Sequence, residues 1–378
     1  MQRSTDRILT THTGSLPRPE ELIQARAGGT GADGTAFEAL LESATAGVVD
    51  KQLAAGIDVV NDGEMSKVAY STYVAERLNG FGGQGSFPRP ADMGDHPDFA
   101  QRMQRRVAAL TMPPACIGPV SWKDRSAVQG DIARLKKALA GKDPRDAFMT
   151  AASPGVIALF LENQYYPSHE AYLAALSGVM REEYEAIAAA GFILQLDCPD
   201  LGVGRHSRSA ATVADFIRIA EQNVSALNAA IANIPAEQIR LHLCWGNYEG
   251  PHHLDIPLRD IIATVFEANV TGISFEGANP RHAHEWAIFK DVKLPPGKVL
   301  IPGVLDSSTN YIEHPELVAE RIIRYAELVG RENVIAGSDC GFSTFASSDP
   351  PIAPSITWAK LRALSDGAAL ASRHLWRT

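Results

Sequence analysis

Arg240-Leu-His-Leu-Cys-Trp-Gly246 is the stretch from which both the fold and the site of this chain can be approached. Its apolar residues and terminal glycine are typical of a short buried β-strand that ends in a turn. His242 and Cys244 are two residues apart, so on a strand their side chains point to the same face. An imidazole and a thiol that converge on one point suit zinc, although a buried cysteine beside a core histidine gives the same pattern.

Similar apolar runs recur on both sides of this stretch and alternate with helical patterns. The predicted strands are 8–15, 57–64, 147–154, 192–199, 240–246, 270–276, 299–304 and 334–341. The clearest predicted helices are 36–55, 130–141, 169–190, 211–232 and 356–374. Repeated β-then-α units predict a parallel sheet, and eight of them in 378 residues favour a closed (β/α)8 TIM barrel over an open doubly wound sheet.

Residues 80–122 interrupt this alternation. The part from 80 to 112 is rich in glycine and proline and is predicted to be an inserted loop or lid. Residues 115–122 are predicted to form an extra hairpin strand. We therefore expect residues 1–378 to be a single barrel domain with an insertion at 80–122.

Composition excludes several classes of protein. The chain is 45% hydrophobic and carries a formal charge of −9, so nucleic acid and anionic membrane surfaces are poor partners. The four cysteines show no short-range pairing pattern, and the N-terminus lacks the apolar stretch of a signal peptide. No G-x-G-x-x-G motif follows the first predicted strand and no G-x-x-x-x-G-K motif occurs, which argues against dinucleotide binding and P-loop chemistry. We expect a cytoplasmic protein with reduced thiols, for which a homo-oligomer is compatible with the sequence.

The carboxyl ends of the predicted strands, where a barrel enzyme has its active site, are rich in polar residues. They carry Ser15, Glu64, Ser153, Asp197, His242 with Cys244, Glu276, Asp306 and Cys340. Of these, Ser15, Glu64, Ser153 and Asp197 are candidates for substrate binding. Asp197 and Glu64 can each be read in two ways, as a cap of the following turn or as a carboxylate that anchors a substrate amine.

His242, Cys244, Glu276 and Cys340 form a predicted four-coordinate zinc site. The glutamate would be the weakest ligand and the one that a substrate displaces, as in a catalytic site with an exchangeable position. A thiol bound to zinc is deprotonated at neutral pH, so the predicted chemistry is alkylation of a thiol. Hydrolysis by zinc-bound water is the lesser alternative, because thiolate ligands weaken zinc as a Lewis acid. The two other cysteines, Cys116 and Cys198, are expected to be structural.

Four further side chains are candidates for acid catalysis or anion binding. Arg281, His282 and His284 lie in Phe275–Trp286, and His252 lies in Gly250-Pro-His-His253. Arg281 would bind an anionic substrate group, and any of the three histidines would serve as a general acid. The same residues are also compatible with a solvated helix start or an exposed loop.

Six short motifs together resemble the catalytic barrel of the cobalamin-independent methionine synthase family. They occur in the family's order: Thr10-Thr-His-Thr-Gly-Ser-Leu-Pro17, Asp62-Gly-Glu64, Gln195-Leu-Asp197, His242-x-Cys244, Glu276 and Asp339-Cys-Gly341. The resemblance implies that His242, Cys244, Glu276 and Cys340 bind zinc. It also implies that Ser15, Glu64 and Asp197 hold the carboxylate and amine of homocysteine.

The chain departs from that family in three features. We expect no counterpart of the second, N-terminal barrel of full-length methionine synthase. The family's catalytic histidine after the seventh strand is replaced within Pro302–Ser308, and the aromatic that would stack on folate falls near Phe160 rather than on a tryptophan. The last two of these departures argue against methyltetrahydrofolate as the donor.

In its sequence motifs, the chain is more similar to the epoxyalkane:coenzyme M transferase branch of the family. The shared segments are Leu241–Gly246, Gly250-Pro-His252, Asp255-Ile-Pro257, Phe275–Trp286 and Leu328–Val334.

The sequence therefore predicts a zinc-dependent thiol S-alkyltransferase that acts on a small-molecule thiol and a methyl or alkyl donor. One alternative is an epoxyalkane:coenzyme M transferase, in which a histidine protonates the opening epoxide. An alternative of another class is a non-catalytic module that binds zinc and presents a thiol to a corrinoid protein.

Overall fold

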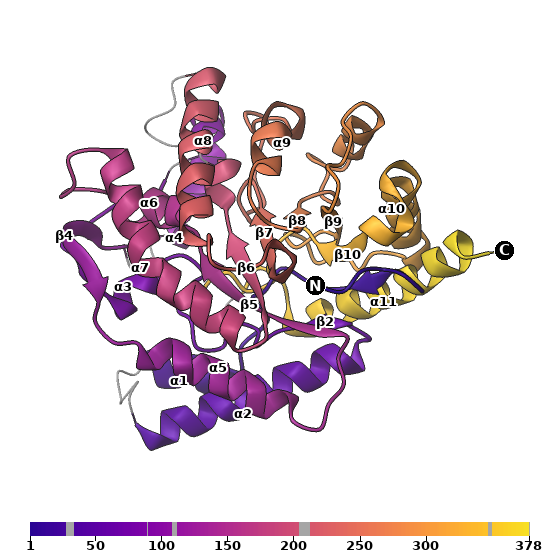
Figure 1. The fold of residues 1–378 in the computed structure, drawn as a ribbon, viewed down its shortest axis with the longest axis horizontal. Helices are drawn as coiled ribbons and strands as arrows, with labels where there is room; N and C mark the ends of the chain where they lie inside the picture. Colours follow the sequence, from indigo (N-terminus) through magenta and orange to yellow (C-terminus); the bar gives the residue numbers. More distant parts are fainter. Residues whose placement is uncertain (28–33, 89, 108–111, 204–211, 347–349, 378) are drawn as a thin grey trace.

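The structure is a computed structural model that describes residues 1–27, 34–88, 90–107, 112–203, 212–346 and 350–377 (Figure 1). Eight parallel strands form its central sheet: β1 (Leu9–Thr10), β2 (Val59–Val60), β5 (Asp146–Ala152), β6 (Ile193–Asp197), β7 (Ile239–Leu243), β8 (Gly272–Phe275), β9 (Val299–Leu305) and β10 (Ile335–Ser338). Their order is β1-β10-β9-β8-β7-β6-β5-β2. The predicted (β/α)8 barrel is confirmed, with all eight predicted strands present.

Asp58 closes the barrel between β1 and β2, the two ends of that strand order. Its backbone N–H donates to Thr10 O at 3.2 Å, and its carboxylate accepts the Thr10 N–H at 2.9 Å. Arg7 binds both carboxylate oxygens, at 2.7 and 2.5 Å. The Asp58 carboxylate thus supplies part of the hydrogen bonding between β1 and β2, which are too short to form a full ladder of backbone hydrogen bonds.

Helices surround the strands and cover their outer face (Figure 1). The α-helices are α1 (Glu20–Ala27), α2 (Thr35–Ala54), α3 (Val74–Arg77), α4 (Pro97–Val107), α5 (Ser126–Leu139), α6 (Pro154–Phe160), α7 (His169–Ala189), α8 (Val213–Ala230), α9 (Leu258–Phe266), α10 (Pro315–Val329) and α11 (Pro354–Leu375). The 3-10 helices are η1 (Ala91–Asp95), η2 (Pro199–Leu201), η4 (Ala236–Gln238), η5 (Glu285–Lys290) and η6 (Arg331–Asn333). No described helix is long and apolar enough to cross a membrane.

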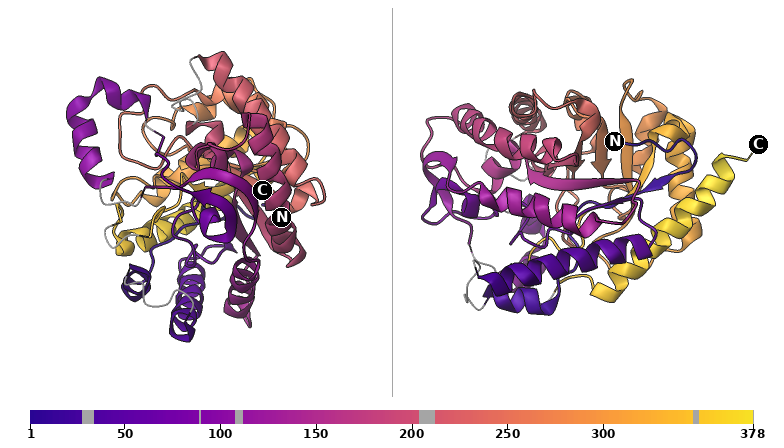
Figure 2. Two further views of the ribbon diagram at one scale, coloured as in Figure 1. Left: turned by 90° about the vertical axis from the view of Figure 1, so that its left-hand side faces the viewer. Right: turned by 60° about the horizontal axis from the view of Figure 1, so that its bottom comes forward.

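The segment predicted as an insertion contains more regular structure than a loop. Strand β3 (Leu78–Gly82) pairs antiparallel with β4 (Ala115–Trp122), which is the predicted extra hairpin. Between them lie η1 and α4, whose sequence from Pro97 to Val107 holds no glycine and no proline after its first residue. Figure 2 (left) shows this purple segment standing out from the barrel at upper left.

A polar network inside the barrel supports the strand ends. Arg240, which is fully buried, donates to Gln195 Oε1 at 2.8 Å, to Thr11 Oγ1 at 3.0 Å and to His12 O at 2.9 Å. The amide of Gln195 in turn donates to Asp197 Oδ1 at 2.8 Å. Because each buried donor has an acceptor, the network fixes the carboxylate of Asp197 at the end of β6.

The seam contact of Asp58 is testable by substitution. We expect Asp58→Ala to lower the free energy of unfolding by about 2 to 4 kcal/mol, because it leaves Arg7 and the Thr10 N–H without their acceptor. Asp50→Ala is the matched control, since the Asp50 carboxylate is 63% exposed in its ion pair with Lys142, and it should cost less than about 1 kcal/mol. If the two variants unfold at the same urea concentration, Asp58 does not stabilise the contact between β1 and β2.

Candidate active site

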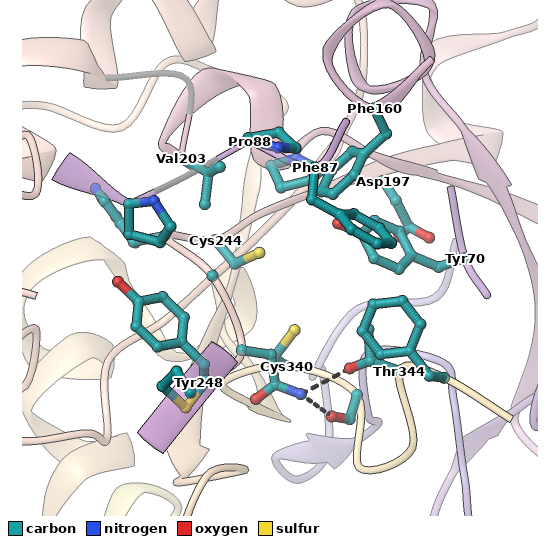
Figure 3. A pocket seen from close by; sticks show the side chains of 18 of the residues that line it. Tyr70, Phe87, Pro88, Phe160, Asp197, Val203, Cys244, Tyr248, Cys340 and Thr344 are labelled. Carbon is teal, nitrogen blue, oxygen red and sulfur yellow. Dashed lines mark hydrogen bonds between the residues drawn. The ribbon is translucent and has the colours of Figure 1, made fainter. Parts of the chain in front are cut away.

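His242, Cys244 and Cys340 come together at the carboxyl ends of β7 and β10. One potential ligand atom from each, the imidazole nitrogen and the two sulfurs, lies within 4.8 Å of the others. Figure 3 shows both sulfur atoms projecting into the same pocket. The structure thus assembles three of the four predicted ligands from residues that are distant in sequence.

The hydrogen bonds and the protonation state of the His242 imidazole suit metal binding. Its Nδ1 lies 3.1 Å from Ser274 Oγ on β8, whereas its Nε2 is buried and has no hydrogen-bond partner among the described residues. Burial lowers the pKa of His242 to about 4, so the ring is neutral at pH 7. Neutral imidazole with a free lone pair is the form that binds a metal.

Asp339 brings Cys340 to its place. Its carboxylate accepts the backbone N–H groups of Gly277 and Ala278 at 2.8 Å and of Asn279 at 2.7 Å. These contacts tie the end of β10 to the loop after β8. A hydrogen bond with Cys340 lowers the pKa of Cys244, and the same bond raises the pKa of the Cys340 thiol.

Glu276, the fourth predicted ligand, lies outside this three-residue group. Its Oε1 accepts the Trp245 N–H at 3.1 Å, and its Oε2 accepts the Asn279 amide at 2.8 Å. Burial, followed by the proximity of Cys244, raises the pKa of Glu276 well above its usual range. The carboxylate therefore sits near the thiols while its two oxygens are engaged by the protein.

A cavity of about 830 Å³ opens beside the two thiols, which is in the range of small-molecule binding sites. The inserted segment covers it with Phe87, Pro88, Met93 and Met103, and the barrel adds Phe160 at the end of α6 and the loop residues Tyr70, Tyr248 and Phe345. Figure 3 shows several of these aromatic rings around the sulfur atoms. The cavity is thus apolar over most of its wall and polar where the strands end.

Three of the predicted substrate-binding residues line this cavity: Ser15, Glu64 and Asp197. Glu64 Oε1 accepts the Thr150 hydroxyl at 3.1 Å, whereas Oε2 is buried without a partner among the described residues. Burial, and then the charge of Glu64, raises the pKa of Asp197 to about 7. The carboxylates of Glu64 and Asp197 line the cavity and are suited to accept hydrogen bonds from an amine supplied by a ligand.

The backbone of Glu64 is strained. Its φ of 59° lies in the left-handed region, which costs a residue with a side chain about 1 to 2 kcal/mol. The Asp62 carboxylate accepts its N–H at 3.0 Å, and Arg18 donates to its carbonyl at 3.0 Å. These contacts hold the conformation that turns the side chain into the cavity.

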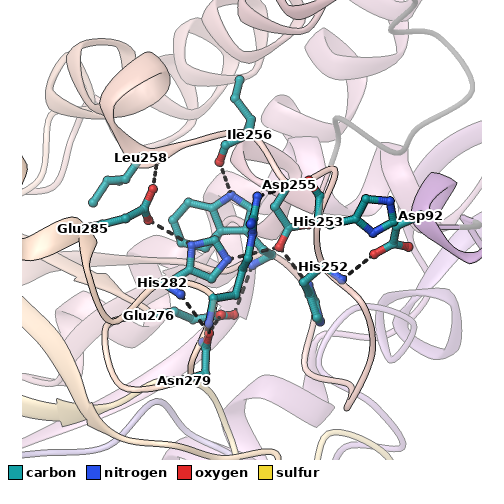
Figure 4. A network of polar contacts seen from close by, with 12 residues as sticks. Asp92, His252, His253, Asp255, Ile256, Leu258, Glu276, Asn279, His282 and Glu285 are labelled. Carbon is teal, nitrogen blue, oxygen red and sulfur yellow. Dashed lines mark hydrogen bonds and ion pairs between the residues drawn. The ribbon is translucent and has the colours of Figure 1, made fainter.

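The three histidines predicted as general acids do not line the cavity. His282 is buried between Asp255, 3.1 Å from Nε2, and Glu285, 2.9 Å from Nδ1, and its ring stacks on Trp245 (Figure 4). His252 contacts Asp255 at 2.8 Å and Tyr248 O at 3.0 Å. Both imidazoles have their nitrogens occupied by the protein, and the third, His284, is exposed.

Three other strand-end or loop candidates also have local partners away from the cavity. Ser153 caps α6 by accepting the Val156 N–H at 3.0 Å, and it donates to Asp200. Asp306 accepts from Ser308 within its own turn. Arg281 is exposed and donates to His253 O at 3.1 Å. Their position in the sequence did not show whether these side chains bind a substrate or make local contacts within the protein.

Sequence reasoning missed the residues that orient the candidate ligands and form the cavity wall. Ser274 could have been found, because on β8 it pairs with His242 in the register of the two strands. Asp339 was part of a recognised motif, but its role depends on backbone contacts made 60 to 62 residues away. No sequence pattern marked Phe87 and Met93 as part of the cavity wall, apart from their position in the predicted insertion.

Comparison with known proteins gives three similarities. The model of the family described as cobalamin-independent synthase, catalytic domain, matches residues 149–350. Methionine synthases of Saccharolobus solfataricus and Sulfolobus acidocaldarius are 24% identical over 377 residues and 25% identical over 339 residues. These alignments cover 97% and 88% of this chain, and 96% and 85% of the relatives.

Among solved structures, a B12-independent methionine synthase from Shewanella sp. W3-18-1, in complex with selenomethionine, has the same fold. The TM-score is 0.76 at 21% identity, with 98% of this chain and 99% of the other covered.

The ion pairs of His282 generate a pH-dependent prediction. Burial alone would lower its pKa, but hydrogen bonds with Asp255 and Glu285 outweigh burial and raise the pKa to about 10. The stabilisation is complete below the unfolded pKa of about 6.5 and is lost as pH rises through 10. His282→Ala should therefore cost about 3 to 5 kcal/mol at pH 7, and less at pH 10.

Urea unfolding of wild type and variant at pH 7, 8.5 and 10 measures this difference. His253→Ala is the control, because its ion pair with Asp95 is solvent-exposed and should contribute less than about 1 kcal/mol at any of these pH values. A cost for His282→Ala that is the same at all three pH values would refute the buried-cation role.

Proposed function

This chain belongs to the family of cobalamin-independent synthase catalytic domains, and from that membership we propose that it is a zinc-dependent methyltransferase acting on homocysteine. The observation that carries the proposal is one buried constellation. A nitrogen and two sulfurs lie within 4.8 Å of one another, beside a cavity that also contains two carboxylates. The first set suits zinc and a thiol, and the second suits the ammonium group of an amino acid.

His242, Cys244 and Cys340 would hold the metal. The fit rests on the buried, unpartnered Nε2 of His242 and on the nitrogen-sulfur donor set, which is typical of zinc sites. A thiol coordinated to zinc at this position would have a lowered pKa and would be ionised at neutral pH. Glu276 remains the candidate for a fourth ligand.

The chain's own residues would orient the thiol substrate. Glu64 and Asp197 would accept hydrogen bonds from its ammonium group, and Ser15 would contact its carboxylate. Holding both groups of the amino acid aims the sulfur at Cys244 and Cys340 and removes the entropic cost of finding that orientation in the reaction. The selenomethionine complex of the Shewanella relative supports an amino-acid ligand for this fold.

The inserted segment would align the methyl donor and exclude water. Phe87 and Met93 of the inserted segment line the cavity together with Phe160 of α6. An apolar wall favours a direct transfer of the methyl group between donor and sulfur, because it keeps competing water away. The thiol proton is lost to solvent when the substrate binds, and the leaving group takes the bonding electron pair of the methyl group.

Two alternatives are less well supported. Opening of an epoxide was predicted to use His252, His282 or His284 as the acid, and none of these three lines the cavity. A non-catalytic module that presents a thiol to a corrinoid protein does not need an apolar cavity of this size, and it would be inert with small-molecule donors.

The proposal predicts methionine formation. Zinc-loaded protein supplied with homocysteine and either methylcobalamin or methyltetrahydrofolate should release methionine with one of them, as measured by mass spectrometry. Cys340→Ser and His242→Ala should lower kcat by more than about 100-fold, because even residues that only orient metal ligands contribute 10- to 100-fold.

Cys116→Ser is the matched control, since Cys116 is a buried thiol that lies on β4 and outside the three-residue group. It should retain activity within about threefold. If neither donor gives methionine, or if Cys116→Ser and Cys340→Ser lose activity equally, the proposed function is wrong. Coenzyme M with an epoxide donor tests the first alternative in the same assay.

A further inference from the structure

Lys67 and Thr150 form a chain of contacts that ends on Glu64. Lys67, which is 3% exposed, donates from Nζ to Thr150 O at 2.6 Å and to Thr150 Oγ1 at 2.9 Å. Thr150 Oγ1 lies 3.1 Å from Glu64 Oε1. Neither Lys67 nor Thr150 lines the cavity, so neither is explained by direct contact with a ligand.

We propose that Lys67 and Thr150 are positioning residues that aim the free oxygen of Glu64 at the substrate ammonium, and so make the site selective for aminothiols. This inference rests on the proposed function in one respect, that a thiol substrate occupies the cavity. It goes further because it names what distinguishes the preferred thiol and which buried residues impose that preference.

The direction of each hydrogen bond follows from the chemistry of the groups. A lysine ammonium can only donate, so Thr150 Oγ1 must accept from Lys67. The hydroxyl has a single hydrogen, which is then left for Glu64 Oε1. That oxygen is therefore occupied, and the second oxygen of Glu64 remains the one that can accept from a ligand.

Packing confines the carboxylate to this arrangement. Gly14 lies against it so closely that a Cβ there would be 2.7 Å from Glu64 Oε1 and 2.8 Å from Thr150 Cγ2. The left-handed backbone of Glu64 sets the direction in which its side chain leaves the chain. Oε2 is buried and has no partner among the described residues.

An unpartnered buried oxygen makes a site selective. A thiol with an ammonium group satisfies Oε2, whereas the same thiol without it leaves the oxygen desolvated and unpaired. Sites built to hydrogen-bond one group of a substrate reject the analogue that lacks it by large factors. The ammonium of Lys67 also lies 4.5 Å from the centroid of the Tyr73 ring, a contact that helps to keep it in place.

The experiment compares two thiols that differ only in the amine: homocysteine and 4-mercaptobutanoate. Their dissociation constants are measured by calorimetry on the zinc-loaded protein, so that the result does not depend on a methyl donor. Wild type should prefer homocysteine by more than about 100-fold. Thr150→Val, which keeps the shape and removes the hydroxyl, should reduce that preference about tenfold, and Lys67→Met should reduce it similarly.

Thr150→Ser restores the hydroxyl and should restore the preference. Thr357→Val is the matched control, because the hydroxyl of Thr357 is also buried but has no partner among the described residues, and it should leave both constants unchanged. The inference would be overturned if the wild type binds both thiols equally well. It would also be overturned if Thr150→Val raises the dissociation constants of both thiols by the same factor, or changes neither. If homocysteine binds selectively but no donor gives methionine, the proposed function fails while the positioning role stands.

Discussion

Three backbone N–H groups after β8 bind the carboxylate of Asp339, and the candidate active site depends on this contact. Parallel strands in a barrel end at the same face, but their loops still need a fixed distance between them. The carboxylate sets that distance for β8 and β10. As a result Cys340 stands beside Cys244, while Glu276, which precedes the three N–H groups, is held near both thiols.

Two of the seven buried, unpartnered polar side-chain atoms among the described residues belong to residues that line the cavity. His242 Nε2 and Glu64 Oε2 are unpartnered among the described residues, although their neighbours are extensively hydrogen-bonded. Each such atom lowers the free energy of unfolding by about 1 to 3 kcal/mol, because it is desolvated without a hydrogen bond. A ligand that binds to the atom offsets this loss. One atom suits a metal ion and the other an ammonium group, and both belong to the same pocket region of about 830 Å³.

The repeat of apolar strands was predictable from sequence because β6 and β7 are buried at every position, and the predicted extra strand matches β4. The two-residue strands β1 and β2 were predicted too long, because Asp58 replaces part of their pairing with a side chain. The pair His242 and Cys244 was predictable from its spacing. The ion pair of His282 with Asp255 was not, because it joins side chains that are 27 residues apart in the sequence.

Three side chains from two strand ends are proposed to create a metal site that is open to a thiol. Zinc K-edge absorption of the reconstituted protein, with and without homocysteine, tests it most directly. The account predicts about one zinc per chain with nitrogen and sulfur neighbours, and one additional sulfur neighbour when homocysteine is added. Protein that takes up no zinc, or a zinc spectrum that homocysteine leaves unchanged, would contradict the account.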